Sequence, residues 1–217
     1  MYKVDLHTHS SQSPDGGITA DQYRKALRSG LLDVIAITDH NSVAMGLDLN
    51  REFGDQIIVG EEIMTTHGEI VGLYLSEKVP AGLSPLDTIK HIKDQGGIVY
   101  IPHPFETIRK GIAPHILESI ADYVDIIEVC NGRAFLQNRS AQAVVWARLN
   151  QKDSAASSDA HGYRGLGRTY SDLPQMPTRD TLLTLLDTAV LRTRNPSFRA
   201  LLYPKYHRLR KKIGGNT

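Results

Sequence analysis

The stretch YKVDLHTH, residues 2–9, joins a short strand pattern to two histidines. From Tyr2 to Leu6, apolar and polar side chains alternate, which is typical of a β-strand. His7 and His9 follow two residues apart, and alternate residues of a strand project to the same face. Both imidazoles are therefore expected on one side of the first strand, close enough to act together.

Similar short runs, rich in β-branched residues and bounded by Gly, Asp or Pro, recur along the chain. The expected strands are 3–9, 33–38, 56–62, 69–75, 97–101, 124–129 and 153–158. The expected helices are 19–29, 84–95, 138–149 and 178–188. The second helix opens on Ser84 as N-cap and Pro85 at the first helical position. Strands that alternate with helices predict an α/β protein whose parallel strands close into a barrel, with residues 1–217 as a single domain.

The amino-acid composition and net charge exclude several classes of protein. The chain has 25 Lys and Arg against 24 Asp and Glu, so it is not a strongly basic nucleic-acid binder overall. Its single cysteine, Cys130, excludes an internal disulfide and favours a reducing compartment. No signal peptide or membrane span is evident, so a cytoplasmic protein is expected.

The C-terminal segment is different, because from Arg192 onward there are eight Lys and Arg and no Asp or Glu. A solvated chain end is the favoured interpretation. Contact with nucleic acid is the alternative.

Polar residues close most of the expected strands, and in a barrel these ends meet at one rim, where active sites of such folds lie. The residues concerned are His7, His9, His40, Glu62, His103, Asp159 and His161. Five histidines and several carboxylates exceed what one proton relay needs. Mixed imidazole and carboxylate ligands suit zinc, manganese or iron, whereas calcium prefers oxygen alone.

In order and spacing, six motifs resemble the PHP (polymerase and histidinol phosphatase) family. They are HTHS (7–10), SPDG (13–16), AITDH (36–40), VGEEI (59–63), IPHP (101–104) and SSDAH (157–161). The resemblance implies a distorted (β/α)7 TIM-like barrel that holds two to three divalent ions, Mn, Zn or Fe, at the strand ends. The resemblance runs from His7 to His161 and leaves the last quarter of the chain less distinctive, and a basic C-terminal extension of the domain is expected from about residue 192.

The resemblance further implies a division of ligands. The first metal would be held by His7, His9, Glu62 and Asp159. The second would share Glu62 and use His103, and the third would use Asp15, His40 and His161. Where many relatives have a histidine before the apolar run, this chain has Glu69. Glu69 is favoured as the missing ligand because it is in register with Val71 and Leu73, and His67 is the alternative.

Such ions suit hydrolysis of a phosphoester by a metal-bridged hydroxide, so no protein nucleophile is assigned. Asp39 is expected either to orient a ligand imidazole or to cap a helix. Arg133 is the first candidate for binding a substrate phosphate, and Arg109 and Arg168 are weaker ones.

The expected function is a metal-dependent phosphoric ester hydrolase acting on a small phosphorylated substrate or nucleotide. One alternative is a 5′–3′ exonuclease on short oligonucleotides, and another is a non-catalytic metal-binding module of a larger assembly. The sequence leaves the oligomeric state open.

Overall fold

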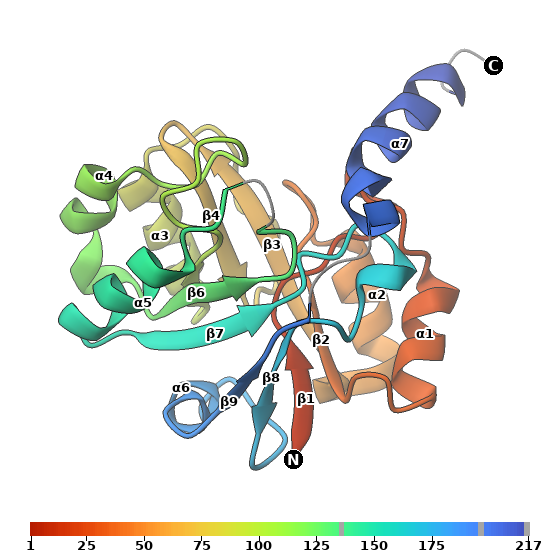
Figure 1. Cartoon of the computed structure of the whole chain (residues 1–217), viewed down its shortest axis with the longest axis horizontal. Coiled ribbons are helices and arrows are strands. Elements are labelled where there is room, and N and C mark those ends of the chain that lie inside the picture. Colours follow the sequence, from red (N-terminus) through yellow and green to blue (C-terminus); the bar gives the residue numbers. More distant parts are fainter. Residues whose placement is uncertain (135–136, 195–197, 215–217) are drawn as a thin grey trace.

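The computed structural model describes residues 1–134, 137–194 and 198–214. Within them, nine strands form one sheet in the order β7-β6-β5-β4-β3-β2-β1-β8-β9. The strands are β1 (Tyr2–Asp5), β2 (Val34–Ile37), β3 (Ile57–Thr65), β4 (Gly68–Leu73), β5 (Ile98–Ile101), β6 (Ile126–Asn131), β7 (Asp153–Ser157), β8 (Tyr170–Leu173) and β9 (Val190–Arg192). The helices are α1 (Ala20–Arg28), α2 (Ala44–Phe53), α3 (Pro85–Asp94), α4 (Pro114–Ser119), α5 (Ser140–Leu149), α6 (Leu182–Leu186) and α7 (Phe198–Gly214), with short 3-10 turns at Gly54–Gln56, Ala121–Tyr123 and Tyr163–Gly165. The predicted α/β barrel class is confirmed (Figure 1).

Local sequence signals set the helix starts. Thr19 caps α1 through a capping box with Gln22. Ser84 caps α3 by accepting a hydrogen bond from the Asp87 N–H, and Pro85 occupies the first turn. The expected starts of both helices are therefore confirmed. The expected helix 178–188 is shorter than predicted, since α6 spans Leu182–Leu186.

The strands do not all run parallel. β1 pairs with β2, and β2 with β3, in parallel, but β4 runs antiparallel to both β3 and β5. A tight turn at residues 65–68 links β3 directly to β4, without the crossover helix that parallel neighbours require. The expectation of an all-parallel barrel was wrong at this strand. The reversal brings the start of β4 to the rim where the parallel strands end.

The sheet curls until its two ends nearly meet. Beyond the end of β1, the His9 N–H donates to the Ala160 carbonyl at 2.9 Å, just beyond β7. Ser171 of β8 bonds the backbone of Ala156 of β7 through its hydroxyl. These contacts close the gap between β7 and the β1–β8 pair. β1 itself ends at Asp5, so His7 and His9 extend from the strand rather than close it.

Alternate residues of the strands pack on opposite sides of the sheet. Val34 and Ala36 of β2 pack in one apolar cluster with residues of neighbouring strands. Ile35 and Ile37 pack in another cluster that includes Tyr23 of α1. Because both faces are covered, β2 is apolar throughout, which is typical of a barrel strand.

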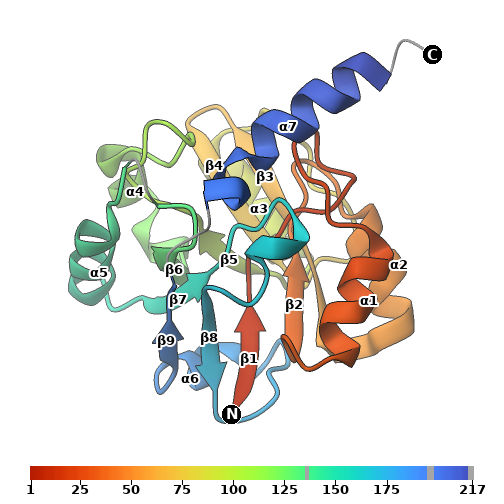
Figure 2. The ribbon, with the colours of Figure 1, turned by 45° about the vertical axis from the view of Figure 1, so that its right-hand side comes forward.

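The basic C-terminal segment leaves β9 at Arg192 and is a helix from Phe198 to Gly214. α7 crosses the end of the barrel toward which β1 and β2 point (Figure 2). Most described side chains of this helix are exposed, as expected for a solvated chain end, but its backbone is helical and it contacts the barrel; residues 195–197 and 215–217 lie outside the described part. Among the described helices, none combines the length and apolar character that crossing a bilayer would require.

Candidate metal centre

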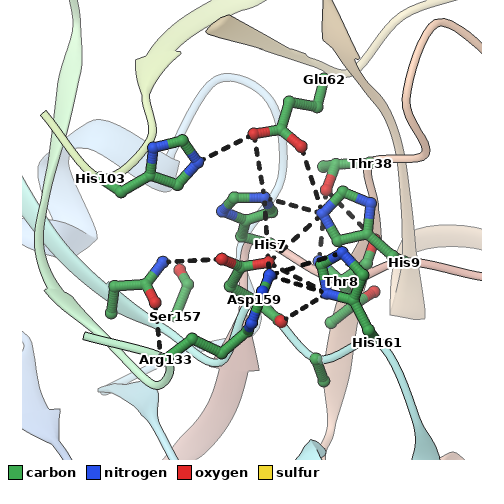
Figure 3. Close-up of polar contacts among 12 residues, drawn as sticks. His7, Thr8, His9, Thr38, Glu62, His103, Arg133, Ser157, Asp159 and His161 are labelled. Atoms are coloured by element: carbon green, nitrogen blue, oxygen red, sulfur yellow. Dashed lines mark hydrogen bonds and ion pairs between the residues drawn. The ribbon is translucent and has the colours of Figure 1, made fainter. Parts of the chain in front are cut away.

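The nine residues expected to bind metal are gathered at one end of the barrel. Seven of them line a cavity of about 610 Å³, namely Asp15, His40, Glu62, Glu69, His103, Asp159 and His161. The other two, His7 and His9, are fully buried beside these residues. Figure 3 shows the carboxylates and imidazoles turned toward one another.

The two histidines of the opening motif face each other through ring nitrogens. His7 Nε2 lies 3.0 Å from His9 Nε2. His7 Nδ1 is 3.1 Å from Glu128, and His9 Nδ1 is 3.2 Å from the Ser13 hydroxyl. When Nδ1 donates to these partners, both Nε2 atoms present lone pairs to the same point. A cation there, either a proton or a metal ion, would relieve their repulsion.

Two residues that are not expected ligands orient this pair. Glu128 accepts hydrogen bonds from Tyr100 Oη and the His103 N–H as well as facing His7. Asp39 accepts from the Ser13 hydroxyl at 2.7 Å, and Ser13 in turn contacts His9. Asp39 therefore supports a ligand imidazole through Ser13. It does not cap α2, whose N-cap is Val43.

Glu62 lies at the middle of the group. Its Oε1 is 3.1 Å from His103 Nε2 and 3.5 Å from His7 Nε2. Its Oε2 is 3.1 Å from His40 Nδ1 and 3.2 Å from His9 Nε2. Burial disfavours the charged carboxylate, but the His40 and His7 imidazoles outweigh it and hold the pKa of Glu62 well below its usual value. An ionised carboxylate between four imidazoles can bridge two cations.

A second carboxylate joins the first two histidines. Asp159 Oδ1 is 3.5 Å from His9 Nε2 and 3.9 Å from His7 Nε2. The backbone φ of Asp159 is +49° and that of His103 is +31°. Both values lie in the left-handed region that residues other than glycine rarely adopt. Such strain concentrates at functional sites, where the surrounding structure holds it.

Asp15, His40 and His161 form a third group on the outer side. Asp15 Oδ1 lies 3.4 Å from His161 Nε2 and 3.5 Å from His40 Nε2, and this buried oxygen has no hydrogen-bond partner among the described residues. Burial, together with the nearby Arg133 charge, lowers the pKa of His161 to about 3. The imidazole is therefore neutral at physiological pH, which is the form that binds metal.

Glu69 lies at this centre and His67 does not. Glu69 Oε1 is 3.7 Å from His40 Nδ1, and its Oε2 is 3.8 Å from His103 Nε2. Burial, with the charge of Glu62, raises the pKa of Glu69 to about 9. His67 lies on the exposed turn before β4, and its ring contacts Thr66. The antiparallel direction of β4 explains the placement, because it brings the first residues of that strand to the rim.

The residues present fit divalent metal ions. Four sets of donor atoms each lie within 4.8 Å of one another: His7–His9–Asp159, His7–Glu62–His103, His40–Glu62–Glu69 and His9–His40–His161. Three of these sets overlap the expected ligand groups, whereas the last has His9 in place of Asp15. The mixture of imidazole and carboxylate is typical of sites for zinc, manganese and iron.

The three arginines considered for phosphate binding differ in position. Arg133 lines the cavity, and its Nη1 is 3.1 Å from Asp159. Arg109 also lines it but is engaged by Glu106, Asn131 and Asp159. Arg168 lines a small neighbouring pocket and donates to the Arg164 carbonyl. The sequence interpretation missed three further cations that line the cavity, Lys110 and the α7 residues Lys205 and Arg208.

The fold and this rim define an α/β-barrel protein with a buried imidazole–carboxylate centre. The uncharacterized protein MJ1587 of Methanocaldococcus jannaschii is 36% identical over 156 residues, which are 66% of this chain and 91% of that protein. The uncharacterized protein MJ0417 of the same organism is 34% identical over 177 residues, 77% of this chain and 69% of that protein. No model of a known protein family matches the chain.

Solved structures share the fold at lower identity. A two-domain protein of Bacteroides vulgatus, described as containing a PHP-like metal-dependent phosphoesterase, has a TM-score of 0.69 at 22% identity, over 95% of this chain and 69% of that one. PsfC of Pseudomonas syringae has a TM-score of 0.69 at 16% identity, over 96% and 98% of the two chains. Endonuclease Q, in complex with a 27-mer duplex, has a TM-score of 0.57 at 11% identity, over 90% and 60%. The chain is therefore related to the two Methanocaldococcus proteins, and it shares its fold with structures described as PHP-like metal-dependent phosphoesterases.

Proposed function

We propose that this protein is a metal-dependent phosphoesterase that hydrolyses a small phosphomonoester or a nucleotide. The observation that carries the proposal is the position of Glu62, whose two oxygens each face imidazoles from different parts of the rim. A shared carboxylate is what a centre of two or more ions requires, and such centres are suited to phosphoester hydrolysis.

In this proposal two or three ions, Mn, Zn or Fe, occupy the centre. His7, His9, Glu62 and Asp159 hold the first, Glu62, Glu69 and His103 the second, and Asp15, His40 and His161 the third. When bound, these ions neutralise phosphate oxygens and make water acidic enough to react near neutral pH.

Other residues of the site orient the imidazoles of the centre and bind the substrate. Glu128 fixes the His7 ring through Nδ1, and Asp39 acts on His9 through Ser13, so that each Nε2 is directed inward. Arg133 binds a phosphate oxygen from the side of Asp159. The cavity of about 610 Å³ is within the range that holds ligands of nucleotide size.

The test is hydrolysis of p-nitrophenyl phosphate and of a nucleotide panel by protein reconstituted with Mn²⁺. The proposal predicts turnover that chelation abolishes and that His9→Ala abolishes without unfolding the protein. Failure of metal-replete protein to hydrolyse any member of the panel, or any oligonucleotide, would contradict it and favour the non-catalytic module.

A second candidate, a 5′–3′ exonuclease on short oligonucleotides, is favoured by one observation. The basic helix α7 lies beside the cavity and contributes Lys205 and Arg208 to its lining. End-labelled DNA and RNA of a few nucleotides, assayed beside the nucleotide panel, separate the two candidates. Release of successive mononucleotides from these oligonucleotides faster than the protein hydrolyses free nucleotides would favour the exonuclease.

A further inference from the structure

One face of α7 forms a wall of the cavity. Leu201, Pro204, Lys205 and Arg208 line it at spacings of three, one and three residues. Relative to Leu201 these residues stand at i+3, i+4 and i+7, and such positions lie on one side of a helix. The inward face of α7 therefore directs two cationic side chains to the space above the candidate metal centre.

Close contacts hold α7 in this place. A Cβ on Gly17 would overlap the His207 ring, and a Cβ on Gly162 would lie 2.7 Å from the Tyr203 ring. His207 and Tyr203 stack on each other with ring centroids 5.6 Å apart. Gly17 and Gly162 each lie within two residues of an expected ligand, so the helix is packed directly against the loops that carry the third ligand group.

Lys211, near the C-terminal end of α7, also binds the helix to the barrel. Its ammonium group donates to the Ser11 carbonyl at 2.8 Å, to the Gly16 carbonyl at 3.0 Å and to the Ser13 carbonyl. These carbonyls surround the turn that bears Asp15. The position of α7 is thus fixed relative to the candidate metal centre.

Arg208 reaches the centre itself. Its Nη2 lies 2.6 Å from Asp15 Oδ2, whereas the other oxygen of Asp15 faces His40 and His161. This is the single hydrogen bond of Arg208 to the part of the chain that the structure describes, and 62% of its side chain is exposed. Most donors of its guanidinium are consequently available for a ligand in the cavity.

The two arginines of the cavity outside α7 already contact several protein groups. Arg109 is bound on three sides, and Arg133 Nη1 contacts Asp159 and His161. Lys205, in contrast, has no hydrogen bond or ion pair with the described residues. Lys110, which also lines the cavity, is likewise without a side-chain partner among the described residues, so two of the three cations that have most of their donors free, Lys205 and Arg208, lie on α7.

We propose that Lys205 and Arg208 complete, with Arg133 beside Asp159, the subsite that binds the phosphate group of the substrate, so that α7 is part of the active-site wall. This inference rests on the proposed phosphoesterase function. In it, the Arg208 guanidinium spans Asp15 and a phosphate oxygen, and the Lys205 ammonium group contacts a second oxygen. Charge-assisted hydrogen bonds of this kind are the stronger ones in proteins.

The test titrates inorganic phosphate into Mn²⁺-loaded protein by calorimetry, with the metal content of each sample measured in parallel. Arg208→Gln is expected to weaken phosphate binding about tenfold or more, and Lys205→Gln by a smaller factor, with metal content unchanged. Arg208→Lys should recover part of the loss. Arg210→Gln is the matched control, because Arg210 is exposed on the same helix and does not line the cavity.

Three outcomes would overturn the inference. They are no binding of phosphate by the wild type, the same affinity in Arg208→Gln as in the wild type, or loss of a metal ion in Arg208→Gln, which would make Arg208 a positioning residue for Asp15. The inference and the proposed function fail separately. Phosphate binding that depends on Arg208, without turnover of any ester, contradicts only the function, whereas turnover with an unchanged KM in Arg208→Gln contradicts only the inference.

Discussion

Glu62 and His103 come together at the rim of the barrel, with Glu62 Oε1 3.1 Å from His103 Nε2, although they are 41 residues apart in sequence. Between them in the chain lie the antiparallel strand β4 and the helix α3. The pair exists because β3 and β5, each next to β4, bring their residues to the same rim. Because Glu62 also faces His7, His9 and His40, we expect the candidate metal centre to depend on this residue most.

Replacement of Glu62 by Gln should remove more metal than any other conservative change. An amide oxygen carries no charge and cannot bridge two cations, so we expect at least one ion per chain to be lost at equal free Mn²⁺. Metal analysis after gel filtration measures this. Glu61→Gln is the control, since Glu61 is also buried but accepts a hydrogen bond from the Val79 N–H, away from the centre. Equal metal content in the two variants would contradict the bridging role.

Glu69→Gln should lower bound metal by about one ion per chain, because its two oxygens face His40 and His103. His67→Gln is the matched control, two residues earlier and exposed, and should leave the count unchanged. If His67→Gln loses the ion and Glu69→Gln keeps it, the assignment is reversed.

The place of Glu69 shows how far the sequence alone could lead. The alternation of Glu69, Val71 and Leu73 correctly indicated a strand with these residues on one face. Periodicity says nothing about strand direction, however, and in a parallel barrel the first residue of a strand lies at the rim opposite the site. The structure places Glu69 at the candidate centre, but the antiparallel β4 that brings it there was not foreseen.

The pH dependence of stability should differ between metal-free and metal-loaded protein. Burial opposes the charge on His9, but hydrogen bonds to Asp159 and Glu62 outweigh it and raise its pKa to about 9. This contribution to stability is complete below the unfolded pKa of 6.5 and is lost as pH rises toward 9. Burial and the charge of Glu62 raise the pKa of Glu69 to about 9, so the folded protein keeps this carboxyl protonated while the unfolded chain ionises it, and stability falls with rising pH for this group as well.

We therefore expect the Tm of metal-free protein to fall by about 5 °C or more between pH 6.5 and 8.5. Metal ions displace these protons and bind more tightly as pH rises, so the stabilisation by Mn²⁺ should grow over the same range. Thermal unfolding in a chelator and in Mn²⁺ measures both curves. A stabilisation by metal that shrinks with rising pH would show that these groups do not bind it.

Gly17→Ala should release α7 from the barrel, because the added methyl group would overlap the His207 ring. Released α7 exposes Lys205 and Arg208, and trypsin should cleave there about tenfold faster while the barrel stays intact. Gly46→Ala is the control, since its Cβ would make only ordinary contact with Val59 at 3.4 Å. Unchanged proteolysis in Gly17→Ala would mean that this contact does not hold the helix.

The role of α7 was hidden from the sequence for a physical reason. Its cavity-facing residues recur at helical spacing, but one of them is Pro204, and a proline argues against the interior of a helix. A run of basic residues, moreover, is usually a solvated chain end. What docks the helix is the absence of side chains at Gly17 and Gly162, far away in the sequence. The gathering of the expected ligands at one rim, in contrast, was predictable because most of them stand in local motifs at strand ends.

Anomalous diffraction from crystals of the Mn²⁺-loaded protein tests the central claim most directly. The account predicts two or three manganese peaks at the rim, with Glu62 Oε1 and Oε2 contacting different ions and His103 and His9 on opposite sides of that carboxylate. A single peak that Glu62 does not contact, or none at this rim, would contradict it.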